Sequence, residues 1–311
     1  MIQAPLGFLG LRLVCPRCRS PLVVAVDGAS CASCQAVFPA RERILDLRAG
    51  RVGAAGFDPH YFPTLAAVER EHYWFVTRRE VVRDILKDAV PDLERRALFD
   101  VGCGSGGLLA FLGRSGVALA GACDVYPESL ALVRQRVAAP LLLVDEGRLP
   151  PLAPGQALLS LFDVLEHIDD DLGTLRGLFE ALEPGGVLVL TVPAHPFLFD
   201  EMDEIAQHRR RYTRRQLGDR LRLAGFRVRH LAHFMAPLVP LVALRWAVRL
   251  LAGRRSAIAR RNLELAVTPV LNGVMRALLR LERPLVRAGL LPFGSSLIAV
   301  AERPRGSAGA L

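Results

Sequence analysis

A glycine-rich turn after a short apolar run is the feature that most limits how this chain can fold. Residues 97–107 read ALFDVGCGSGG. Glycine has no Cβ, so such a turn lets the backbone approach a ligand closely, and the helix expected after it directs free N–H groups to the same place. A second apolar run, VALAGACD, ends in Asp124, 24 residues after Asp100. In a βαβ unit this spacing puts a carboxylate at the neighbouring strand tip, where it can hold both hydroxyls of a ribose.

The glycine spacing separates two kinds of nucleotide-binding turn. A dinucleotide-binding turn follows G-x-G-x-x-G, whereas Gly102, Gly104 and Gly106 follow G-x-G-x-G, with Asp100 two residues ahead of the first glycine. The shorter loop has no pyrophosphate to hold and can wrap an amino-acid moiety instead. The turn resembles motif I of the class I S-adenosylmethionine-dependent methyltransferases.

Three later segments resemble the same superfamily, in its order. LLLVDEGRLPPL (141–152) is similar to its D-x-x-x-L-P segment, LFDVLEHIDDD (161–171) resembles the exit of its fourth strand, and LEPGGVLVLTVP (182–193) matches its L-x-P-G-G turn. The resemblance covers about half of the chain. It implies S-adenosylmethionine as the cofactor and places Asp145 near the adenine amino group. The cofactor-binding residues that we expect are Asp100, Gly102, Gly104, Gly106, Asp124, Asp145 and Phe162.

Two C-x-x-C pairs near the N-terminus are the second informative pattern. Each pair presents two thiolates from one tight turn, and the twelve residues between the pairs suffice for a β-ribbon. Four thiolates in this arrangement predict a closed, tetrahedral, structural zinc site. Two dithiol redox motifs are the alternative, but a redox pair needs no second copy at ribbon spacing. The expected zinc ligands are Cys15, Cys18, Cys31 and Cys34.

The N-terminal segment resembles the zinc ribbons that precede some bacterial methyltransferases, one of which is the large-subunit ribosomal RNA guanine methyltransferase. A Gly/Ala-rich stretch follows it and predicts a linker. We therefore expect Cys31→Ser to destabilise the ribbon without affecting the cofactor site. A helical period over residues 66–90 predicts one helix before the core. The expected organisation is a zinc ribbon at 1–48, a linker at 49–65, a cofactor-binding core at 66–235, an apolar basic helical insertion at 236–292, and a last strand and tail at 293–311.

An acid-x-x-Glu-His cluster follows the fourth expected strand. On a helix, Asp163, Glu166 and His167 would share one face. Ubiquinone-biosynthesis O-methyltransferases and small-RNA 2′-O-methyltransferases carry a similar cluster that binds a divalent cation, so the resemblance implies a Mg²⁺ site on these three residues. The same D-x-x-E pattern is also a capping box that needs no metal, and His167 alone could be a general base. His208, at the start of HRRRYTRRQL, is a second candidate base or ligand.

Positive charge is concentrated in one part of the chain. The net charge is +9, but residues 205–292 carry 19 arginines against three acids. Such a block is usually an interaction surface, and within it residues 210–212 are suited to an anionic substrate. The 236–292 insertion combines apolar turns with arginine and Trp246, the composition of interfacial membrane helices. A helical lid, a subunit contact and an RNA surface are the alternatives, and no charge-free apolar run is long enough to span a bilayer.

These patterns together predict an α/β protein: a zinc ribbon, then a seven-stranded Rossmann-like class I methyltransferase sheet with a helical insertion between strands 6 and 7. The expected activity is methyl transfer from S-adenosylmethionine to an oxygen of a small or lipid-linked acceptor, with His167 and His208 as catalytic candidates. We expect a cytoplasmic protein with peripheral contact at the inner membrane face. One alternative is an RNA base methyltransferase that uses the ribbon and the arginines. Another is a non-catalytic partner that keeps the fold.

Overall fold

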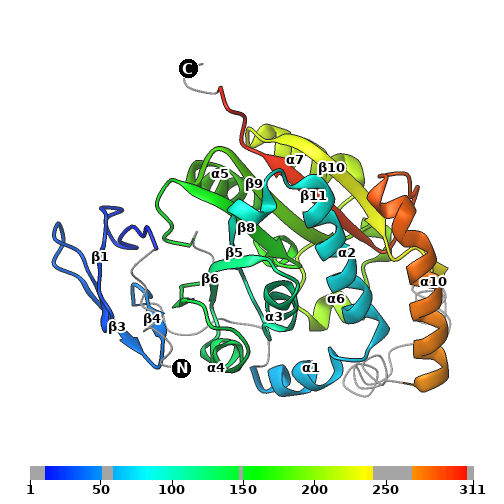
Figure 1. The fold of residues 1–311 in the computed structure, drawn as a ribbon, viewed down its shortest axis with the longest axis horizontal. Coiled ribbons are helices and arrows are strands. Elements are labelled where there is room, and N and C mark those ends of the chain that lie inside the picture. The colour runs from blue at the N-terminus through cyan, green and yellow to red at the C-terminus, as the bar shows by residue number, and fades with distance from the viewer. Residues whose placement is uncertain (1–10, 51–58, 147–149, 241–267, 307–311) are drawn as a thin grey trace.

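A single mixed sheet forms the centre of the molecule. The structure is a computed structural model that describes residues 11–50, 59–146, 150–240 and 268–306 (Figure 1). The sheet has the strand order β1-β2-β3-β4-β7-β6-β5-β8-β9-β11-β10. From β7 to β10 the strands run parallel except β11, which is antiparallel to both of its neighbours. These seven strands are β5 (Ala97–Val101), β6 (Ala118–Asp124), β7 (Leu141–Leu143), β8 (Gln156–Phe162), β9 (Leu182–Pro193), β10 (Arg227–Phe234) and β11 (Ser296–Glu302).

Helices cover both faces of this sheet, so its strands are buried on two sides and are almost continuously apolar. In β9, Leu188 and Leu190 pack into one hydrophobic core, while Val187 and Val189 pack into the other. The helices α5 and α7 cover the first core, and α2, α3, α4 and α10 cover the second. The helices are α1 (Phe62–Val68), α2 (Tyr73–Ala89), α3 (Gly107–Arg114), α4 (Pro127–Arg136), α5 (Asp171–Ala181), α6 (Glu201–Ile205), α7 (Arg214–Leu223) and α10 (Pro269–Arg287).

The helical segment before the core is two helices, so the expectation of one helix over 66–90 is wrong. The chain leaves helical geometry at His72, where φ is −63° and ψ is 130°. The His72 side chain accepts a hydrogen bond from the Trp74 N–H at 3.3 Å and so caps α2. A polar cap of this kind starts a new helix inside a segment whose apolar spacing looks continuous.

The N-terminal ribbon is joined to the core by more than the linker. Its last strand, β4, pairs in parallel with β7, with Leu45 opposite Leu142. The Leu47 N–H then donates to the Leu143 carbonyl at 2.9 Å. The ribbon therefore extends the central sheet (Figure 1, blue). Its strands are β1 (Val23–Val24), β2 (Gly28–Ser30), β3 (Val37–Arg41) and β4 (Ile44–Asp46).

Only part of the expected helical insertion lies in the described residues, because 241–267 fall outside them. The part that is described includes α10, which packs on α2 through ion pairs. Arg283 pairs with Glu80 and Asp84, and Arg287 pairs with Asp88. Two arginines of the expected basic stripe are therefore used inside the molecule. In the described part of the chain, no helix combines the length and apolar character needed to cross a bilayer.

Candidate functional site

The glycine turn after β5 adopts a conformation that needs glycine. Gly102, Gly104 and Gly106 have φ values of 77°, 52° and 75°, in the left-handed region. A Cβ on Gly102 would lie 2.5 Å from the Val164 side chain, and a Cβ on Gly106 would lie 2.8 Å from Val133. Close packing therefore excludes side chains at Gly102 and Gly106, whereas a Cβ on Gly104 would have no atom within 4 Å, and the turn leads directly into α3.

Two buried carboxylates stand on either side of this turn. Asp124, at the end of β6, accepts hydrogen bonds from the N–H groups of Gly104 at 2.8 Å and Tyr126 at 3.0 Å. Asp100 accepts from the Ser160 hydroxyl at 2.6 Å. Burial raises the pKa of both carboxyl groups, that of Asp100 to about 6. Such groups bind a positively charged ligand readily, because the ligand offsets the cost of burying the charge.

The remaining predicted cofactor residues lie on the same edge of the sheet. Phe162 ends β8, next to β5, and Asp145 follows β7, next to β6. Both are buried, and the Oδ1 atom of Asp145 has no hydrogen-bond partner among the described residues. In an open α/β sheet a ligand binds outside the carboxyl ends of the strands, and the expected residues thus line that position.

Sequence reasoning missed Arg78, which α2 brings to this edge. Its Nη2 donates to the Phe162 carbonyl at 2.8 Å, and its Nε lies 2.5 Å from Asp163 Oδ2. Its guanidinium also lies over the rings of Trp74 and Phe162. Arg78 therefore fixes the exit of β8. Its place on a helix surface, among other arginines, gave no signal in the sequence.

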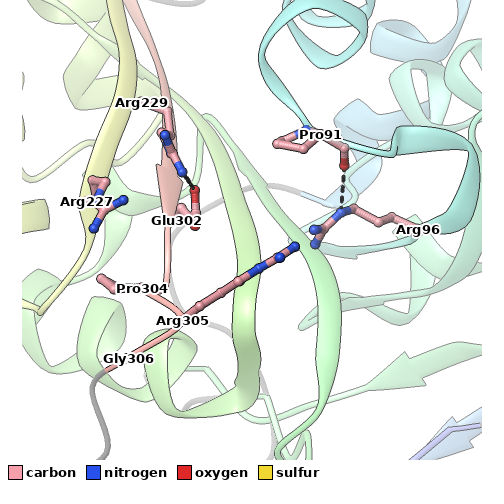
Figure 2. A pocket seen from close by; sticks show the side chains of 9 residues that line it. Pro91, Arg96, Arg227, Arg229, Glu302, Pro304, Arg305 and Gly306 are labelled. Atoms are coloured by element: carbon pink, nitrogen blue, oxygen red, sulfur yellow. Dashed lines mark hydrogen bonds and ion pairs between the residues drawn. The ribbon is translucent and has the colours of Figure 1, made fainter.

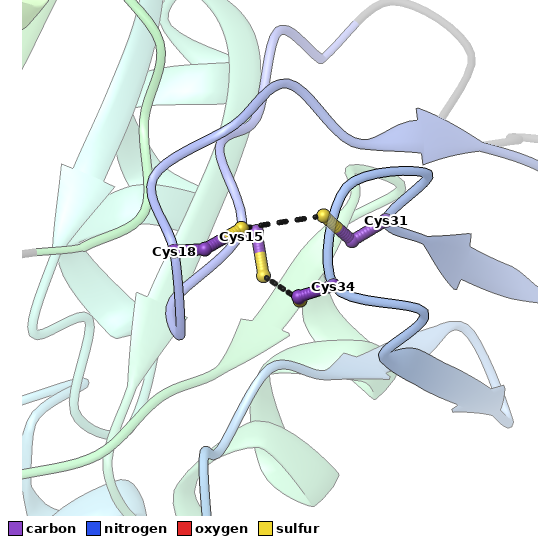
Figure 3. A group of neighbouring side chains, drawn as sticks. All are labelled: Cys15, Cys18, Cys31 and Cys34. Atoms are coloured by element: carbon purple, nitrogen blue, oxygen red, sulfur yellow. Dashed lines mark hydrogen bonds between the residues drawn. The ribbon is translucent and has the colours of Figure 1, made fainter.

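The four ribbon cysteines come together as a metal site would require (Figure 3). Their sulfur atoms all lie within 4.8 Å of one another, with Cys15 and Cys34 at 3.6 Å and Cys18 and Cys31 at 3.4 Å. A disulfide needs an S–S distance of about 2.05 Å. Zn–S bonds of about 2.3 Å in a tetrahedron place sulfurs about 3.8 Å apart. The cluster therefore fits a structural zinc ion.

The N-terminal ribbon contacts the segment that carries Asp145, one of the expected cofactor-binding residues. Just after β4, the Ala49 N–H donates to Asp145 Oδ2 at 2.9 Å. On the other side of the same loop, the Val14 N–H donates to the Pro151 carbonyl at 2.9 Å. The ribbon thus holds both ends of the segment that carries Asp145. The expectation that a cysteine substitution leaves the cofactor site unaffected does not follow from this geometry.

A second group of metal-capable side chains lies beyond β8. One ligand atom each from Glu166, His167 and His208 lies within 4.8 Å of the others. Glu166 is 0% exposed, and neither of its carboxylate oxygens has a hydrogen-bond partner among the described residues. Burial, and then repulsion by Asp163, raise the pKa of Glu166 well above its usual value. A buried carboxylate without partners is costly unless a cation or proton joins it.

The imidazole of His208 is held in a defined orientation. Its Nδ1 lies 2.7 Å from Asp203 Oδ1, and Asp203 in turn accepts a bifurcated hydrogen bond from the Arg211 Nε–H, at 2.9 Å to each oxygen. Since a carboxylate can only accept, Nδ1 carries the proton. The other nitrogen, Nε2, then presents its lone pair and lies 3.9 Å from Glu166 Oε1. A histidine oriented by a carboxylate in this way is typical of metal ligands and general bases.

The structure corrects three expectations for this region. Asp163 is not among the grouped ligands, although it is near enough to raise the pKa of Glu166, because its backbone is left-handed (φ 57°) and its carboxylate pairs with Arg78. The segment after it is a single 3₁₀ turn, Leu165–His167, without a side-chain cap, so the capping-box interpretation is wrong. The anion-binding role of 210–212 also fails: Arg211 pairs with Asp203, and Arg210 and Tyr212 contact the buried Asp171.

Comparison with known proteins gives a consistent result. A family model described as "Methyltransferase domain" matches residues 72–231. A probable S-adenosylmethionine-dependent methyltransferase of Mycolicibacterium smegmatis is 29% identical over 173 residues, which are 53% of this chain and 63% of that protein. The chain therefore spans less than two thirds of that relative.

One solved structure shares the fold at low identity. The [4+2]-cyclase SpnF matches with a TM-score of 0.51 at 19% identity, over 80% of this chain and 94% of that one. An S-adenosylmethionine-dependent methyltransferase from Mesorhizobium loti matches with a TM-score of 0.45 at 16% identity, over 70% and 95% of the two chains. The first likeness shows the fold alone. The family model covers more than half of the chain, so the protein belongs to the class I S-adenosylmethionine-dependent methyltransferases and carries an N-terminal four-cysteine cluster.

Proposed function

We propose that this methyltransferase modifies an oxygen atom of a small or lipid-linked acceptor, bound beside Glu166, His167 and His208. The observation that carries the proposal is the fully buried Glu166 carboxylate, which has no hydrogen-bond partner among the described residues and faces the free nitrogen of an oriented histidine. Glu166 follows β8, which pairs with the strand that leads into the cofactor turn, and His208 reaches it from the segment after α6. An acceptor hydroxyl needs a proton acceptor there, and the pair supplies one.

Residues of this chain can remove the proton of the acceptor hydroxyl. Attack of an acceptor oxygen on the methyl group of a bound cofactor would break the S–CH₃ bond and leave its electron pair on sulfur, and the hydroxyl proton would have to be taken up by the protein. Where no cation is bound, His208 Nε2 accepts that proton, and Asp203 stabilises the resulting imidazolium. Asp203 is fixed by Arg211, so the imidazole keeps its orientation. The cofactor supplies the electrophilic methyl group, and alignment with it is the other part of the catalysis.

The same three side chains fit a divalent cation. Two imidazoles and one carboxylate are a donor set that suits Mn²⁺, Fe²⁺ or Zn²⁺ better than Mg²⁺, which prefers oxygen ligands. The buried, unpartnered carboxylate of Glu166 is the part that most needs such an ion. A bound cation would lower the pKa of the acceptor hydroxyl. We therefore place the proposed cation on Glu166, His167 and His208, and not on Asp163.

The acceptor class can be tested with methyl-labelled S-adenosylmethionine. The protein is incubated with organic-soluble, aqueous and RNA fractions of a cell extract, and the labelled product is passed over a cation exchanger. An O-methylated product gains no positive charge, whereas methylation of a tertiary amine does. We expect label in an uncharged, organic-soluble product, absent with His208→Gln. Label in RNA, or in a cationic product, would contradict the proposal.

The membrane part of the proposal rests on the outer face of α10. Apolar residues spaced three or four apart share one face of a helix, and here that face is exposed, with Leu281 at 76%. A row of exposed apolar side chains along one helix face is typical of interaction sites. The arginines in the same part of the chain favour an anionic lipid surface. The outer face of α10 consists of Val270, Val274, Leu278, Leu281 and Leu285.

We expect the protein to float with anionic vesicles and Leu281→Asp to bind them about tenfold or more weakly, because one leucine contributes about 1.5–3 kcal/mol on burial. The measurement is flotation with phosphatidylglycerol vesicles, against neutral phosphatidylcholine vesicles. Leu223→Asp is the matched control, since Leu223 is 63% exposed on α7. Protein that stays at the bottom with both vesicle types would refute membrane contact.

Asp124→Ala should raise the Kd for S-adenosylhomocysteine by about 100-fold or more. The substitution removes the carboxylate that holds the Gly104 and Tyr126 N–H groups, and each hydrogen bond to a charged group is worth about 1.5–3 kcal/mol. Calorimetric titration measures the change, and thermal unfolding checks that the variant folds. Asp92→Ala, at an exposed position, is the control. Unchanged affinity would show that Asp124 does not hold the cofactor.

Cofactor affinity should rise with pH through about 6 and level off above it. Burial raises the pKa of Asp100 from 3.8 to about 6, so the carboxyl is neutral below that pH and charged above it. Only the charged form attracts the ammonium group of S-adenosylhomocysteine, so affinity falls by up to tenfold per pH unit on the acid side. Titrations from pH 5 to 8 test this. Asp100→Asn should bind S-adenosylhomocysteine weakly, with an affinity that does not change from pH 5 to 8. A pH dependence like that of the wild type would show that another group titrates.

A further inference from the structure

A basic pocket lies at the amino end of the sheet, on the edge opposite the glycine turn (Figure 2). Its volume is about 600 Å³. Arg96 precedes β5, Gly185 lies at the start of β9, and Arg227 begins β10. Residues 302–306 close the pocket, where β11 ends and the chain continues toward its C-terminus. The function of the cofactor edge does not account for this pocket.

Four arginines and one glutamate give the pocket its charge. Arg229 pairs with Glu302, which neutralises the single acid in the lining. Arg227 and Arg305 have neither an ion-pair nor a hydrogen-bond partner in the described part of the chain. Arg96 is only 7% exposed, yet its charge is met by carbonyl groups alone, those of Pro91 and Ala157 at 2.8 Å each. Three guanidinium charges are therefore left without a carboxylate.

The backbone places Arg305 in the pocket. The Gly185 N–H donates to the Arg303 carbonyl at 2.7 Å, and the Arg303 N–H donates to the Gly186 carbonyl at 2.9 Å. Gly185 has a φ of 85°, and a Cβ there would lie 2.7 Å from Arg305 Nε, so only glycine lets this side chain lie across the turn. In Figure 2 the Arg305 side chain points toward the Arg96 guanidinium. Two guanidinium groups that line one pocket without a carboxylate partner favour an anion there.

We propose that this pocket binds a phosphate-bearing anion. Guanidinium groups match phosphate oxygens in charge and geometry, and each can donate two parallel hydrogen bonds. The volume exceeds that of inorganic phosphate, so the pocket has room for a ligand with further atoms, and Pro91 and Pro304 provide apolar walls for them. A free phosphorylated metabolite and a lipid phosphate headgroup share this chemistry. The inference is independent of the acceptor proposed above, because the pocket lies at the other edge of the sheet.

Two probes separate the two sources of phosphate. The first is pyrophosphate, titrated calorimetrically at constant ionic strength. The second is phosphatidylcholine vesicles with and without phosphatidic acid, in a flotation assay. Saturable binding of pyrophosphate, one per chain, supports a soluble ligand; binding only to the phosphatidic acid vesicles supports a lipid headgroup. Binding of neither probe would overturn the proposal.

The variant that tests the pocket is Arg227→Gln with Arg305→Gln, since neither side chain holds another element in place. We expect this double variant to bind pyrophosphate or the phosphatidic acid vesicles, whichever the wild type binds, about tenfold or more weakly than wild type, because two charge-assisted hydrogen bonds are lost. Arg215→Gln with Arg222→Gln removes the same charge from the exposed surface of α7 and should bind within about twofold of wild type. Equal weakening in both double variants would assign the binding to overall charge and overturn the site. S-adenosylhomocysteine affinity should stay unchanged in both.

Discussion

Glu166→Gln is expected to raise the Kd for Mn²⁺ by about 100-fold or more. Loss of a residue that merely orients a ligand costs about 10- to 100-fold in metal affinity, and Glu166 is the only carboxylate in the proposed donor set. Gln keeps the volume but has no charge to offer a cation. Mn²⁺ is the probe because its electron paramagnetic resonance signal reports free ion directly. The protein is first loaded with one molar equivalent of zinc, which the four thiolates bind in preference to a three-ligand site, so that the cysteine cluster is filled and the Glu166 site stays open to Mn²⁺.

Two further variants make this result specific. Asp203→Asn leaves all three donors in place but releases the orientation of His208, and it should cost about 10- to 100-fold. Glu94→Gln changes the same residue type at an exposed position and should have no effect. S-adenosylhomocysteine should bind to all of them as to wild type, because none touches the glycine turn. If wild-type protein leaves the Mn²⁺ signal unchanged, the three side chains are a proton-transfer site without a metal.

Cys31→Ser is expected to raise the Kd for S-adenosylhomocysteine by about tenfold or more. Structural zinc stabilises a small ribbon by several kcal/mol, so loss of one ligand unfolds it. Unfolding removes the Ala49 N–H from Asp145 and the pairing of β4 with β7. A hydrogen bond to a charged group is worth about 1.5–3 kcal/mol, and one tenfold change in affinity corresponds to about 1.4 kcal/mol. Calorimetry on protein of measured zinc content gives the comparison.

The hydrogen bond and the metal can be tested separately. Ala49→Pro removes the N–H group and keeps all four cysteines, so it should weaken cofactor binding while zinc content stays at one per chain. Val37→Ser, at an exposed position of β3, is the control within the ribbon. Wild-type affinity in zinc-free Cys31→Ser would show that ribbon and cofactor site are independent, as the linker composition had suggested.

The cofactor turn was predictable because its determinants are local. Gly102, Gly104 and Gly106 need their left-handed backbone whatever packs around them, and Asp124 follows from the repeat length of one βαβ unit. The cysteine cluster was predictable for the same reason, since ligand spacing alone brings two knuckles to one ion. In both cases the constraint acts over fewer than about 30 residues.

The rest of the site depends on contacts between distant segments. Arg78 reaches Asp163 only because α2 crosses the end of β8, and the left-handed backbone of Asp163 removes it from the group it was expected to join. His208 meets Glu166 across a long separation in sequence, because Asp203, the third residue of the capping box that Asp200 begins at α6, holds the imidazole in place. Neither arrangement has a periodic signal. The pairing of β4 with β7 could not be predicted from the sequence either, because short apolar runs like these two strands occur throughout the chain.

The parallel contact between β4 and β7 also has a consequence for aggregation. Without the ribbon, β7 would be the last strand of the sheet, three leucines long with one row of unpaired backbone groups. Exposed apolar strand edges pair readily with other chains. The ribbon covers that edge and ends the sheet instead in β1, a strand of two residues. The N-terminal ribbon therefore protects the edge of the sheet from pairing with other chains. A fragment that begins after the linker would self-associate through β7.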